Sequence, residues 1–305
     1  MPDNLYLPEV AVVILNYRGA SDTVACVKSL LLANDPTVII YVCDNNSLDG
    51  SEELIRGAFS SEARVVVLQT GRNGGFAFGN NVGIKAALAV KSIRFIWILN
   101  NDTIVRPGCI PAMRQLMESD SSIGIVGATL VYHDRPDVVQ VRGGSVLNSW
   151  TSISRHIGNG ERLEAMVTTP EVERVLDFIS GASMFVSRCF VETVGVLSER
   201  YFLYFEEADW VARNKGRFRL AYCPNAVIEH KEGASIGSSS ASRLASPFSV
   251  YHICRSRLIF TRTHRMWALP TVVLRMLRYL AASIARRRWG TARAISRAMT
   301  GMGFR

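Results

Sequence analysis

The sequence predicts an α/β fold, in which a mixed, mostly parallel sheet is flanked by helices and followed by a basic helical C-terminal extension. Four apolar, β-branched runs in the first 100 residues predict the sheet, because a helical pattern follows each of them. The charges predict the extension, because residues 233–305 contain 13 Arg but no Lys, Asp or Glu. The composition, 48% hydrophobic and 20% charged over 305 residues, is typical of a globular protein with a large core.

The first hundred residues alternate between strands and helices. Strands that are buried on both faces are expected at residues 11–17, 37–45, 63–70 and 94–100. Helices are expected between them at residues 21–33, 47–59 and 80–90. Strands that alternate with helices pair in parallel, since each helix crosses over one face of the sheet.

The second half of the chain has a looser pattern. Helices are expected at residues 110–119, 189–195 and 205–216, and strands at 123–132, 177–188 and 218–230. Short strands and loops are expected at 133–175, a Gly/Ser-rich linker at 231–249, and basic helices at 250–300. We therefore expect a main domain over residues 1–235, with halves at 1–103 and 104–235, and a linker with basic helices over 236–305.

Polar side chains gather where the four predicted strands end. The strands end in Asn16–Gly19, Asp44–Ser47, Gly71–Gly75 and Asn100–Thr103. Any one of these segments alone would be ordinary turn chemistry. The carboxyl ends of parallel strands meet at one edge of the sheet, where α/β proteins bind ligands, so four together favour a ligand site. No GxGxxG follows the first strand, which argues against a nicotinamide or flavin enzyme.

Several residues at this edge suit a phosphorylated nucleoside. Asp44 can accept a hydrogen bond from a ribose hydroxyl or a base N–H, Arg72 can pair with a phosphate oxygen, and Gly74 lets the backbone approach a ligand closely. Asp102 follows the very apolar strand FIWILN, so its carboxylate must be solvated, paired or metal-bound. Magnesium and manganese sites use one or two carboxylates together with substrate phosphates. For Asp102 taken alone, a turn residue is the simpler alternative.

A second acidic cluster, Glu206, Glu207 and Asp209, opens the helix predicted at 205–216. Acidic residues in a first turn also stabilise the helix dipole, which is the structural alternative. The apolar and aromatic run YFLYF (201–205) just before the cluster favours a pocket instead. Apolar surroundings raise the pKa of a carboxyl group toward the range of a general base. His230 ends the last predicted strand and becomes a candidate only if it lies near Asp102.

Seven segments, in this order, resemble the family 2 glycosyltransferases of the GT-A fold, especially their bacterial rhamnosyltransferase-like members. The segments are VVILNYRG (12–19), CDNNSLDGS (43–51), GRNGGFAFGNNVGI (71–84), LNNDT (99–103), ISGASMFVSR (179–188), YFLYFEEADWVAR (201–213) and AVIEHKEGAS (226–235). The resemblance covers residues 9 to 260. It implies a Rossmann-like GT-A fold whose first half holds a nucleotide-sugar donor and whose second half holds the acceptor.

The resemblance also implies a role for each matching position. The nucleotide sugar would contact Asn16, Asp44, Arg72, Asn73, Gly74, Asn80 and Asn100. LNNDT stands in place of the family's DxD element, which leaves Asp102 as the carboxylate ligand of a divalent Mg²⁺ or Mn²⁺, with His230 as a further ligand. The family's Glu-Asp pair is here Glu206-Glu207, so that Glu207 takes the place of the general base. The acceptor would contact Gly181, Asp209 and Trp210.

The implied reaction is a single inverting displacement in the synthesis of a cell-surface polysaccharide. Glu207 would deprotonate an acceptor hydroxyl, which attacks the anomeric carbon from the face opposite the nucleotide. The metal, Arg72 and either Arg255 or Arg257 would stabilise the departing diphosphate. The donor would be rhamnose on thymidine diphosphate or a hexose on uridine diphosphate, and the acceptor a saccharide or a lipid-linked saccharide.

The C-terminal extension has the pattern of a basic amphipathic helix. Its apolar residues recur on one side at Val272, Val273, Met276, Leu277, Leu280 and Ile284, with a break expected near residues 286–290. Its other side carries Arg275, Arg278, Arg286, Arg293 and Arg297. Such a helix can lie on an anionic membrane surface, or its apolar face can pack on the main domain. If it binds the membrane, removal of residues 264–305 should weaken binding to anionic liposomes.

The expected location is the cytoplasm, peripheral on the inner face of the cell membrane. The N-terminal residues MPDNLYLPEV lack the basic and apolar regions of a signal peptide. Six Cys without a CxxC pair or a zinc-like cluster favour reduced thiols in an intracellular protein. The most apolar window, residues 267–285, has Arg275 and Arg278 in its middle, so no transmembrane span is predicted.

Three other functions compete with this reading. A sugar-1-phosphate nucleotidyltransferase needs a Gly-rich, basic loop after the first strand, but NYRGASDT has one Gly and one Arg. A nucleic-acid-binding protein could use the Arg-rich tail, but the preceding 232 residues carry a net charge of −4, with 22 basic and 26 acidic side chains, so nucleic acid is an unlikely partner. A catalytically degenerate scaffold stays open, because Asn100 and Glu207 depart from the family pattern.

Overall fold

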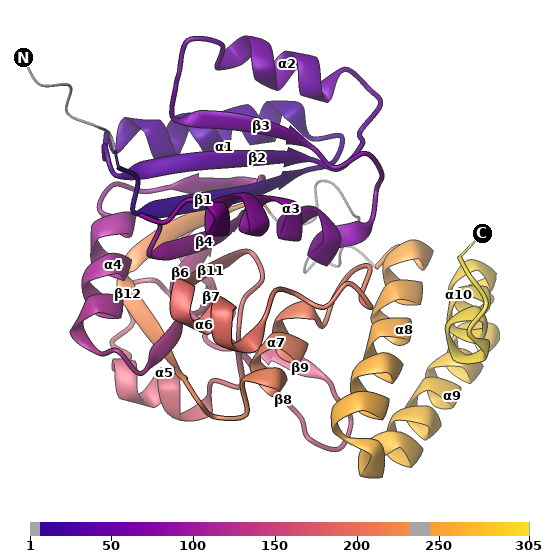
Figure 1. Cartoon of the computed structure of the whole chain (residues 1–305). Helices are drawn as coiled ribbons and strands as arrows, with labels where there is room; N and C mark the ends of the chain where they lie inside the picture. The colour runs from indigo at the N-terminus through magenta and orange to yellow at the C-terminus, as the bar shows by residue number, and fades with distance from the viewer. Residues whose placement is uncertain (1–6, 232–244, 305) are drawn as a thin grey trace, which may run out of the picture.

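The computed structural model describes residues 7–231 and 245–304. Figure 1 shows an α/β body with helices on both faces of a central sheet, and beside it a helical unit formed by the end of the chain. Most of the predicted Gly/Ser-rich linker falls on residues 232–244 and lies outside the described residues.

Nine of the described strands form the central sheet. Its order is β3-β2-β1-β4-β11-β6-β12-β5, and β7 pairs with β6. The strands are β1 (Val10–Asn16), β2 (Val38–Asp44), β3 (Val65–Gln69), β4 (Phe95–Asn100), β5 (Thr103–Val105), β6 (Ile123–Tyr132), β7 (Arg135–Arg142), β11 (Ser183–Ser187) and β12 (Arg219–His230). The first four are parallel, as predicted, whereas β11 runs antiparallel to both of its neighbours. The sheet is therefore mixed, and its parallel half carries the predicted polar strand ends.

A second, antiparallel sheet has the order β10-β8-β9. It consists of β8 (Gly144–Leu147), β9 (Ser154–His156) and β10 (Phe178–Ile179). The prediction of one strand over residues 177–188 is therefore wrong, because β10 and β11 belong to different sheets. The chain turns between them where the carbonyl of Ser180 accepts a hydrogen bond from the N–H of Ser183.

Helices cover both faces of the central sheet. One apolar cluster lies under α1 (Ala20–Leu32), α2 (Ser51–Ala58) and α4 (Cys109–Ser119). The other lies under α3 (Gly75–Ala89), α6 (Arg188–Val194) and α7 (Glu206–Asn214), while α5 (Thr169–Val175) packs beside β12. Each large aliphatic or aromatic side chain buried in these clusters stabilises the fold by about 1.5–3 kcal/mol.

The C-terminal unit consists of α8 (Pro247–His264), the 3₁₀ turn η1 (Met266–Ala268), α9 (Leu269–Ala285) and α10 (Trp289–Thr300). The predicted break near residues 286–290 is confirmed by the gap between α9 and α10. A third apolar cluster joins these helices, with Val272 and Met276 of α9 buried in it and Val273 and Leu280 packed against it. Most of the predicted apolar stripe therefore packs on α8 and α10.

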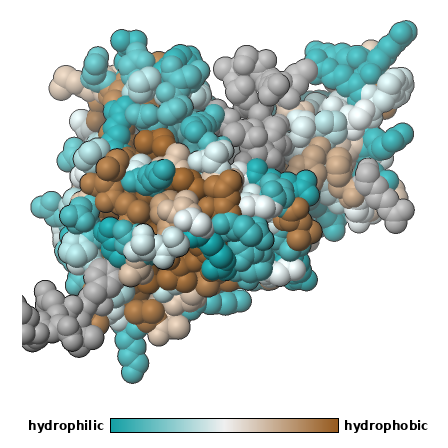
Figure 2. Space-filling view, turned by 90° about the horizontal axis from the view of Figure 1, so that it is seen from above, coloured by the Kyte–Doolittle hydropathy of each residue, from teal (hydrophilic) through white to brown (hydrophobic). Residues whose placement is uncertain are grey.

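The outward face of α9 carries a second apolar strip. Leu274, Leu277 and Ile284 are each about half exposed, and Arg275 and Arg278 lie on the same outward side of the helix. Figure 2 shows hydrophilic side chains projecting from the outer edge of the C-terminal unit. The sequence pattern missed Leu274, because it could not tell which side of the helix the other helices cover.

One stretch of the described chain, Met266–Ala285, is long and apolar enough to cross a membrane by length and composition, with 22% of its window buried. Core helices of soluble proteins pass the same test. Its peripheral placement on a membrane stays a prediction.

Candidate active site

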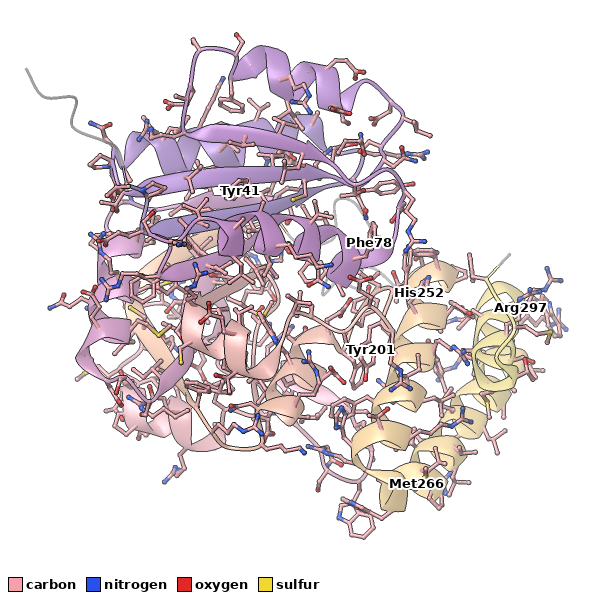
Figure 3. All side chains as sticks on the ribbon, in the orientation of Figure 1. Tyr41, Phe78, Tyr201, His252, Met266 and Arg297 are labelled. Carbon is pink, nitrogen blue, oxygen red and sulfur yellow. The ribbon has the colours of Figure 1, made fainter. Side chains whose placement is uncertain are left out.

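A cavity of about 560 Å³ lies at the carboxyl ends of β1, β2 and β4. Its sheet-edge wall is formed at the strand ends and in the loops after them by Leu15, Tyr17, Asn45, Asn73, Gly75, Phe76, Asn100, Asn101, Asp102 and His230. Its helical wall is formed by Phe202, Leu203, Tyr204, Phe205, Glu206, Glu207, Ala208, Phe248, Ile253 and Arg257. The other lining residues come from β8 to β10 and the adjoining loops. In Figure 3, Tyr201 and His252 lie where the α/β body meets α8.

The structure brings six of the predicted site residues into this cavity. They are Asn73, Asn100, Asp102, Gly181, Glu207 and His230. The other seven predicted residues do not line it. They are Asn16, Asp44, Arg72, Gly74, Asn80, Asp209 and Trp210.

Asn16 and Asp44 form a buried network. Asp44 accepts four hydrogen bonds, from Asn16 Nδ2 at 2.7 Å, from Gln69 Nε2 at 3.1 Å, and from the N–H and the hydroxyl of Ser47. The Oδ1 of Asn16 accepts from the hydroxyl of Thr23 at 2.8 Å. The side chains of Asn16 and Asp44 are almost fully buried. In the structure they fix the loop after β2, whose next residue Asn45 lines the cavity, and their contact with a nucleoside stays a prediction.

Three other residues that were predicted to contact the nucleotide sugar also do not line the cavity. The guanidinium of Arg72 is exposed and sits 4.6 Å from the ring centroid of Phe78. Gly74 faces the same ring, which a Cβ atom would strike. Asn80 is buried in α3, where its Nδ2 donates to the carbonyl of Phe76 at 3.0 Å; its Oδ1 has no hydrogen-bond partner among the described residues.

Gly75 is the glycine that allows a close approach of two backbones. Its φ is +87°, and a Cβ atom there would lie 2.1 Å from the carbonyl oxygen of Phe202. The next N–H, of Phe76, donates to that same carbonyl at 2.8 Å. This contact between the backbones of residues 75–76 and Phe202 joins the sheet-edge wall to the helical wall. α3 begins at Gly75, five residues before its predicted start.

Asp102 and His230 meet in the cavity, although 127 residues separate them in the chain. The antiparallel register of β12 on β5 places His230 opposite Thr103. The imidazole Nε2 then lies 3.2 Å from Oδ1 of Asp102 and 3.5 Å from Nδ2 of Asn100. Burial raises the pKa of Asp102, but the hydrogen bond and charge of His230 and the charge of Lys231 outweigh burial, so the pKa lies below its ordinary value.

This pair fits a divalent cation that is also held by substrate phosphates. The Nδ1 of His230 lies 2.7 Å from Oε1 of Gln140, an acceptor that favours a proton on Nδ1, so that a cation between Nε2 and Asp102 could take the place of the Nε2 proton. A carboxylate oxygen and an imidazole nitrogen so placed could together hold a transition-metal cation such as Mn²⁺, whereas Mg²⁺ would use the carboxylate. The described residues hold no group of three or more His, Cys, Asp or Glu that could bind a metal by themselves.

Glu206 and Glu207 enter the cavity from the first turn of α7. Their carboxyl groups form a hydrogen bond with each other. Burial and the neighbouring Glu207 raise the pKa of Glu206 well above its ordinary value, and burial raises the pKa of Glu207. The Oε1 of Glu206 has no partner among the described residues. A Cβ atom on Gly181 would lie 3.3 Å from Oε1 of Glu207, so the glycine leaves room for this carboxylate.

The backbone just before the two glutamates is strained. Tyr204 and Phe205 have φ values of +69° and +73°, a conformation that L-residues rarely adopt. Each such residue costs about 1–3 kcal/mol and persists only where the surrounding structure holds it. Here the Phe205 ring packs on Phe260 of α8, with 5.3 Å between ring centroids. This sharp turn aims the start of α7 into the cavity.

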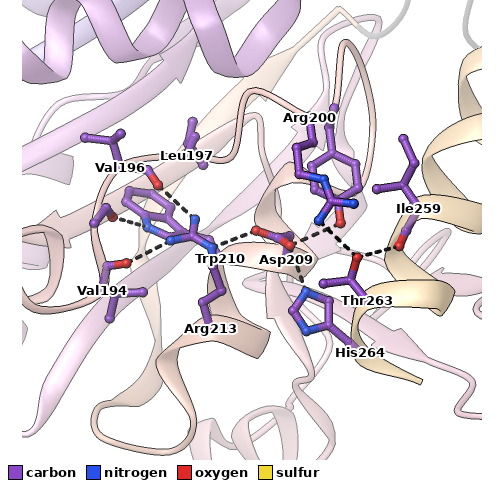
Figure 4. Close-up of polar contacts among 12 residues, drawn as sticks. Val194, Val196, Leu197, Arg200, Asp209, Trp210, Arg213, Ile259, Thr263 and His264 are labelled. Atoms are coloured by element: carbon purple, nitrogen blue, oxygen red, sulfur yellow. Dashed lines mark hydrogen bonds and ion pairs between the residues drawn. The ribbon is translucent and has the colours of Figure 1, made fainter. Parts of the chain in front are cut away.

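Asp209 and Trp210 follow the two glutamates in α7 and do not line the cavity; Figure 4 shows their polar contacts with neighbouring residues. Asp209 is 3% exposed, and its carboxylate binds Arg213 Nε at 2.7 Å, His264 Nε2 at 2.7 Å and the hydroxyl of Tyr201 at 3.1 Å. Trp210 is fully buried and donates its indole N–H to the carbonyl of Gly195 at 2.7 Å. These residues anchor α7 to the body and to α8, and their contact with an acceptor stays a prediction.

Sequence reasoning missed much of the helical wall and part of the sheet-edge wall. Asn45 and Asn101 line the cavity and lie within the predicted polar strand ends, but the site residues predicted from the sequence are their neighbours, Asp44 and Asn100. Phe248 and Ile253 could not be found, because they follow a Gly/Ser-rich stretch and face the cavity only through the packing of α8. Arg257 lines the cavity, whereas the guanidinium of Arg255 lies near Gly301 at the end of α10.

The fold is that of the GT-A glycosyltransferases, as two solved structures show. One is titled as GalNAc-T7 with UDP, GalNAc and Mn²⁺; it has a TM-score of 0.60 at 15% identity and covers 82% of this chain and 48% of its own. The other is a mannosyltransferase of Pyrobaculum calidifontis in complex with GDP-Man and Mn²⁺; it has a TM-score of 0.53 at 15% identity and covers 98% and 88%.

The chain belongs to glycosyltransferase family 2. The family described as "Glycosyltransferase like family 2" matches residues 8–246. A relative in Mycobacterium tuberculosis, the N-acetylglucosaminyl-diphospho-decaprenol L-rhamnosyltransferase, is 30% identical over 263 residues, which covers 79% of this chain and 80% of the relative. The low-salt glycan biosynthesis hexosyltransferase Agl10 of Haloferax volcanii is 24% identical over 257 residues, 83% and 75% of the two chains. The resemblance drawn from the seven segments is thus confirmed.

Proposed function

We propose that this glycosyltransferase moves a hexose, by a metal-dependent inverting displacement, from a nucleoside diphosphate to a saccharide on a lipid carrier. The observation that carries the proposal is that one cavity is lined both by the Asp102–His230 pair and by the buried carboxyl pair Glu206–Glu207. The first pair suits a metal-bound diphosphate, and the second suits removal of a proton from a hydroxyl group.

Glu207 is the proposed general base. Burial raises the pKa of Glu207, which lies beside the space left by Gly181, and the hydrogen bond from Glu206 opposes this rise by lowering the pKa. An acceptor hydroxyl in that space gives its proton to Glu207 as its oxygen attacks the anomeric carbon. The bond from that carbon to the diphosphate oxygen breaks in the same step, so the configuration inverts.

The leaving diphosphate is proposed to lie on the sheet-edge wall. Asp102 and His230 would hold the divalent cation, which supplies positive charge to the departing oxygen when it is bound. Asn45, Asn73 and Asn100 line the same wall and offer amide groups to the nucleoside. Rhamnose on thymidine diphosphate is the first donor to test, since one curated relative is named as an L-rhamnosyltransferase.

The same relative acts on a diphospho-decaprenol saccharide, and two further relatives are named for glycan and succinoglycan biosynthesis. We therefore place this enzyme in the synthesis of a cell-surface glycan. A lipid-linked acceptor lies in a membrane, so the enzyme must reach the membrane surface. We assign that contact to the outward strip of α9, Leu274, Leu277 and Ile284, with Arg275 and Arg278 beside it, at the cytoplasmic leaflet.

Nucleotide titration tests the donor half of the proposal. Calorimetry would measure binding of thymidine and uridine diphosphates, with and without Mn²⁺, to the wild type and to Asp102→Ala. We expect one nucleotide to bind only with Mn²⁺, and the variant to lose that binding. Absence of any nucleotide binding to the wild type would contradict the transferase function and favour the scaffold.

Vesicle sedimentation tests the membrane half. Removal of residues 264–305 is a poor test, because it would uncover Val250, Cys254 and Leu258 of α8. The double substitution Leu274→Ser and Leu277→Ser should instead weaken binding to phosphatidylglycerol vesicles about 10-fold. Leu54→Ser, at a residue equally exposed on α2, is the matched control. Equal binding of both variants, or equal binding to neutral vesicles, would contradict the assignment.

A further inference from the structure

Arg257 is a cation in the cavity that forms no ion pair within residues 7–231 and 245–304. It projects from α8 into the helical wall and is half-buried. Among the described residues no carboxylate forms an ion pair with it, and the charged group that acts on it is Arg275 of α9. Burial lowers the pKa of Arg257. A half-buried cation that the described residues leave without an ion pair suits an anionic ligand.

The guanidinium is held in one orientation. Its Nε donates to the carbonyl of Ser152 at 3.1 Å, and the hydroxyl of Ser152, fully buried, meets the hydroxyl of Thr261 at 3.2 Å. With Nε fixed in this way, the two Nη groups remain to bind an anion. Planar guanidinium groups bind phosphate oxygens through two parallel hydrogen bonds.

Arg257 and the proposed metal ligands line different walls of the cavity. The Asp102–His230 pair stands on the sheet-edge wall, whereas Arg257 shares the helical wall with Glu207. Besides burial, the like charge of Arg275 on α9 lowers the pKa of Arg257, so Arg275 lies within electrostatic range of it. α9 also carries the outward apolar strip, with Leu274 and Leu277 half exposed.

We propose that Arg257 binds the phosphate that joins the acceptor saccharide to its lipid, with Arg275 as an outer contact. This inference rests on the proposed function and names the feature that selects its acceptor. A lipid diphosphate carries its anionic head directly beside the sugar, and Arg257 stands in the same wall of the cavity as Glu207. The enzyme would then prefer a diphospho-linked acceptor to the same saccharide on a neutral alkyl group.

Calorimetry with geranyl diphosphate tests the inference on the full chain. The titration is run with Mn²⁺ and saturating nucleoside diphosphate, so that the donor site is already filled. Arg257→Gln should weaken binding of geranyl diphosphate about 10- to 100-fold, the range for losing charged hydrogen bonds. Arg257→Lys should recover part of that loss. Arg262→Gln, an exposed position on the same helix, should bind as the wild type does.

Three further arms decide which phosphate is bound. Nucleotide binding should stay within about twofold in every variant; if Arg257→Gln weakens nucleotide binding and spares geranyl diphosphate, Arg257 serves the donor and the proposal is wrong. Inorganic pyrophosphate that binds as tightly as geranyl diphosphate would overturn the lipid assignment. Failure of the wild type to bind geranyl diphosphate while it binds the nucleotide would overturn the phosphate subsite and leave the transferase function intact. If Arg257→Gln does not fold, Arg257→Lys gives the answer.

Discussion

The two walls of the cavity differ in how completely their polar groups are paired. Behind the sheet-edge wall, the carboxylate of Asp44 accepts four hydrogen bonds from neighbouring side chains and backbone. In the helical wall, Glu206 Oε1 has no partner and Arg257 forms no ion pair, within the chain as far as the structure describes it. The backbone that leads into this wall is strained at two residues.

This difference indicates where the molecule is built for rigidity and where it is built for reaction. A satisfied network fixes one shape before any ligand arrives, which suits recognition of a nucleotide. Unpaired charges and backbone strain lower stability and are found mostly where a ligand or a proton must be handled. Substitutions in the helical wall should therefore reduce activity without a loss of stability, and substitutions in the networks behind the walls should do the reverse.

The largest effect is expected at Glu207. Glu207→Gln keeps the shape of the side chain but removes the proton acceptor, so sugar transfer should fall about 100- to 10,000-fold. The melting temperature should not fall, because a buried carboxyl group is replaced by a neutral amide. Transfer rates and thermal melts of this variant and of the exposed control Glu164→Gln check both points. A large drop in melting temperature would contradict the expectation that substitutions in the helical wall leave stability unchanged.

The network behind α7 should respond in the opposite way. Asp209→Ala leaves Arg213 and His264 without their shared carboxylate, and removal of one partner of a buried ion pair costs about 3–5 kcal/mol of unfolding free energy. Urea unfolding measures the loss, with the exposed Asp134→Ala as the control. Stability equal to that of the control would show that Asp209 is not a structural anchor.

The difference in unfolding free energy between the wild type and Glu206→Gln should depend on pH. The pKa of Glu206 is raised in the folded protein, so its contribution to stability is full below the ordinary pKa of 4.5 and is lost as the pH rises through the folded value. Glu206→Gln removes this titration. The variant should therefore gain about 1 kcal/mol or more over the wild type between pH 5 and pH 8, the scale of an unpaired buried group. Urea unfolding at both pH values measures the gain, and an equal difference at the two values would contradict it.

The smallest effect concerns strain outside the cavity. Lys215 ends α7 in the left-handed conformation, with φ of +51°, and is exposed. Lys215→Gly should stabilise the protein by about 0.5 kcal/mol, because glycine adopts this conformation without a steric penalty. Transfer activity should not change. A loss of activity would show that the strained backbone of α7 serves the reaction at both of its ends.

The sequence predicted the parallel half of the sheet well, because buried strands carry continuous apolar runs and their ends carry the polar residues. It predicted Asp102 and Glu207 as cavity residues for the same reason: each follows an apolar run at the end of an element or turn. It failed between neighbours such as Asp44 and Asn45. Neighbouring side chains point in different directions, so Asp44 joins the buried network while Asn45 lines the cavity. Both residues are polar, so the sequence does not distinguish them.

The sequence by itself determined the family, the parallel sheet and the two carboxylate motifs, since these depend on local pattern and on order along the chain. Only the tertiary structure decided which members of each motif face the cavity. The register of β12 on β5 brings His230 to Asp102, and the 100° rotation per residue of α7 turns Glu207 inward and Asp209 back toward Arg213. Packing of α8 likewise brings Arg257 to the cavity, because contacts between distant segments leave no periodic trace in the sequence.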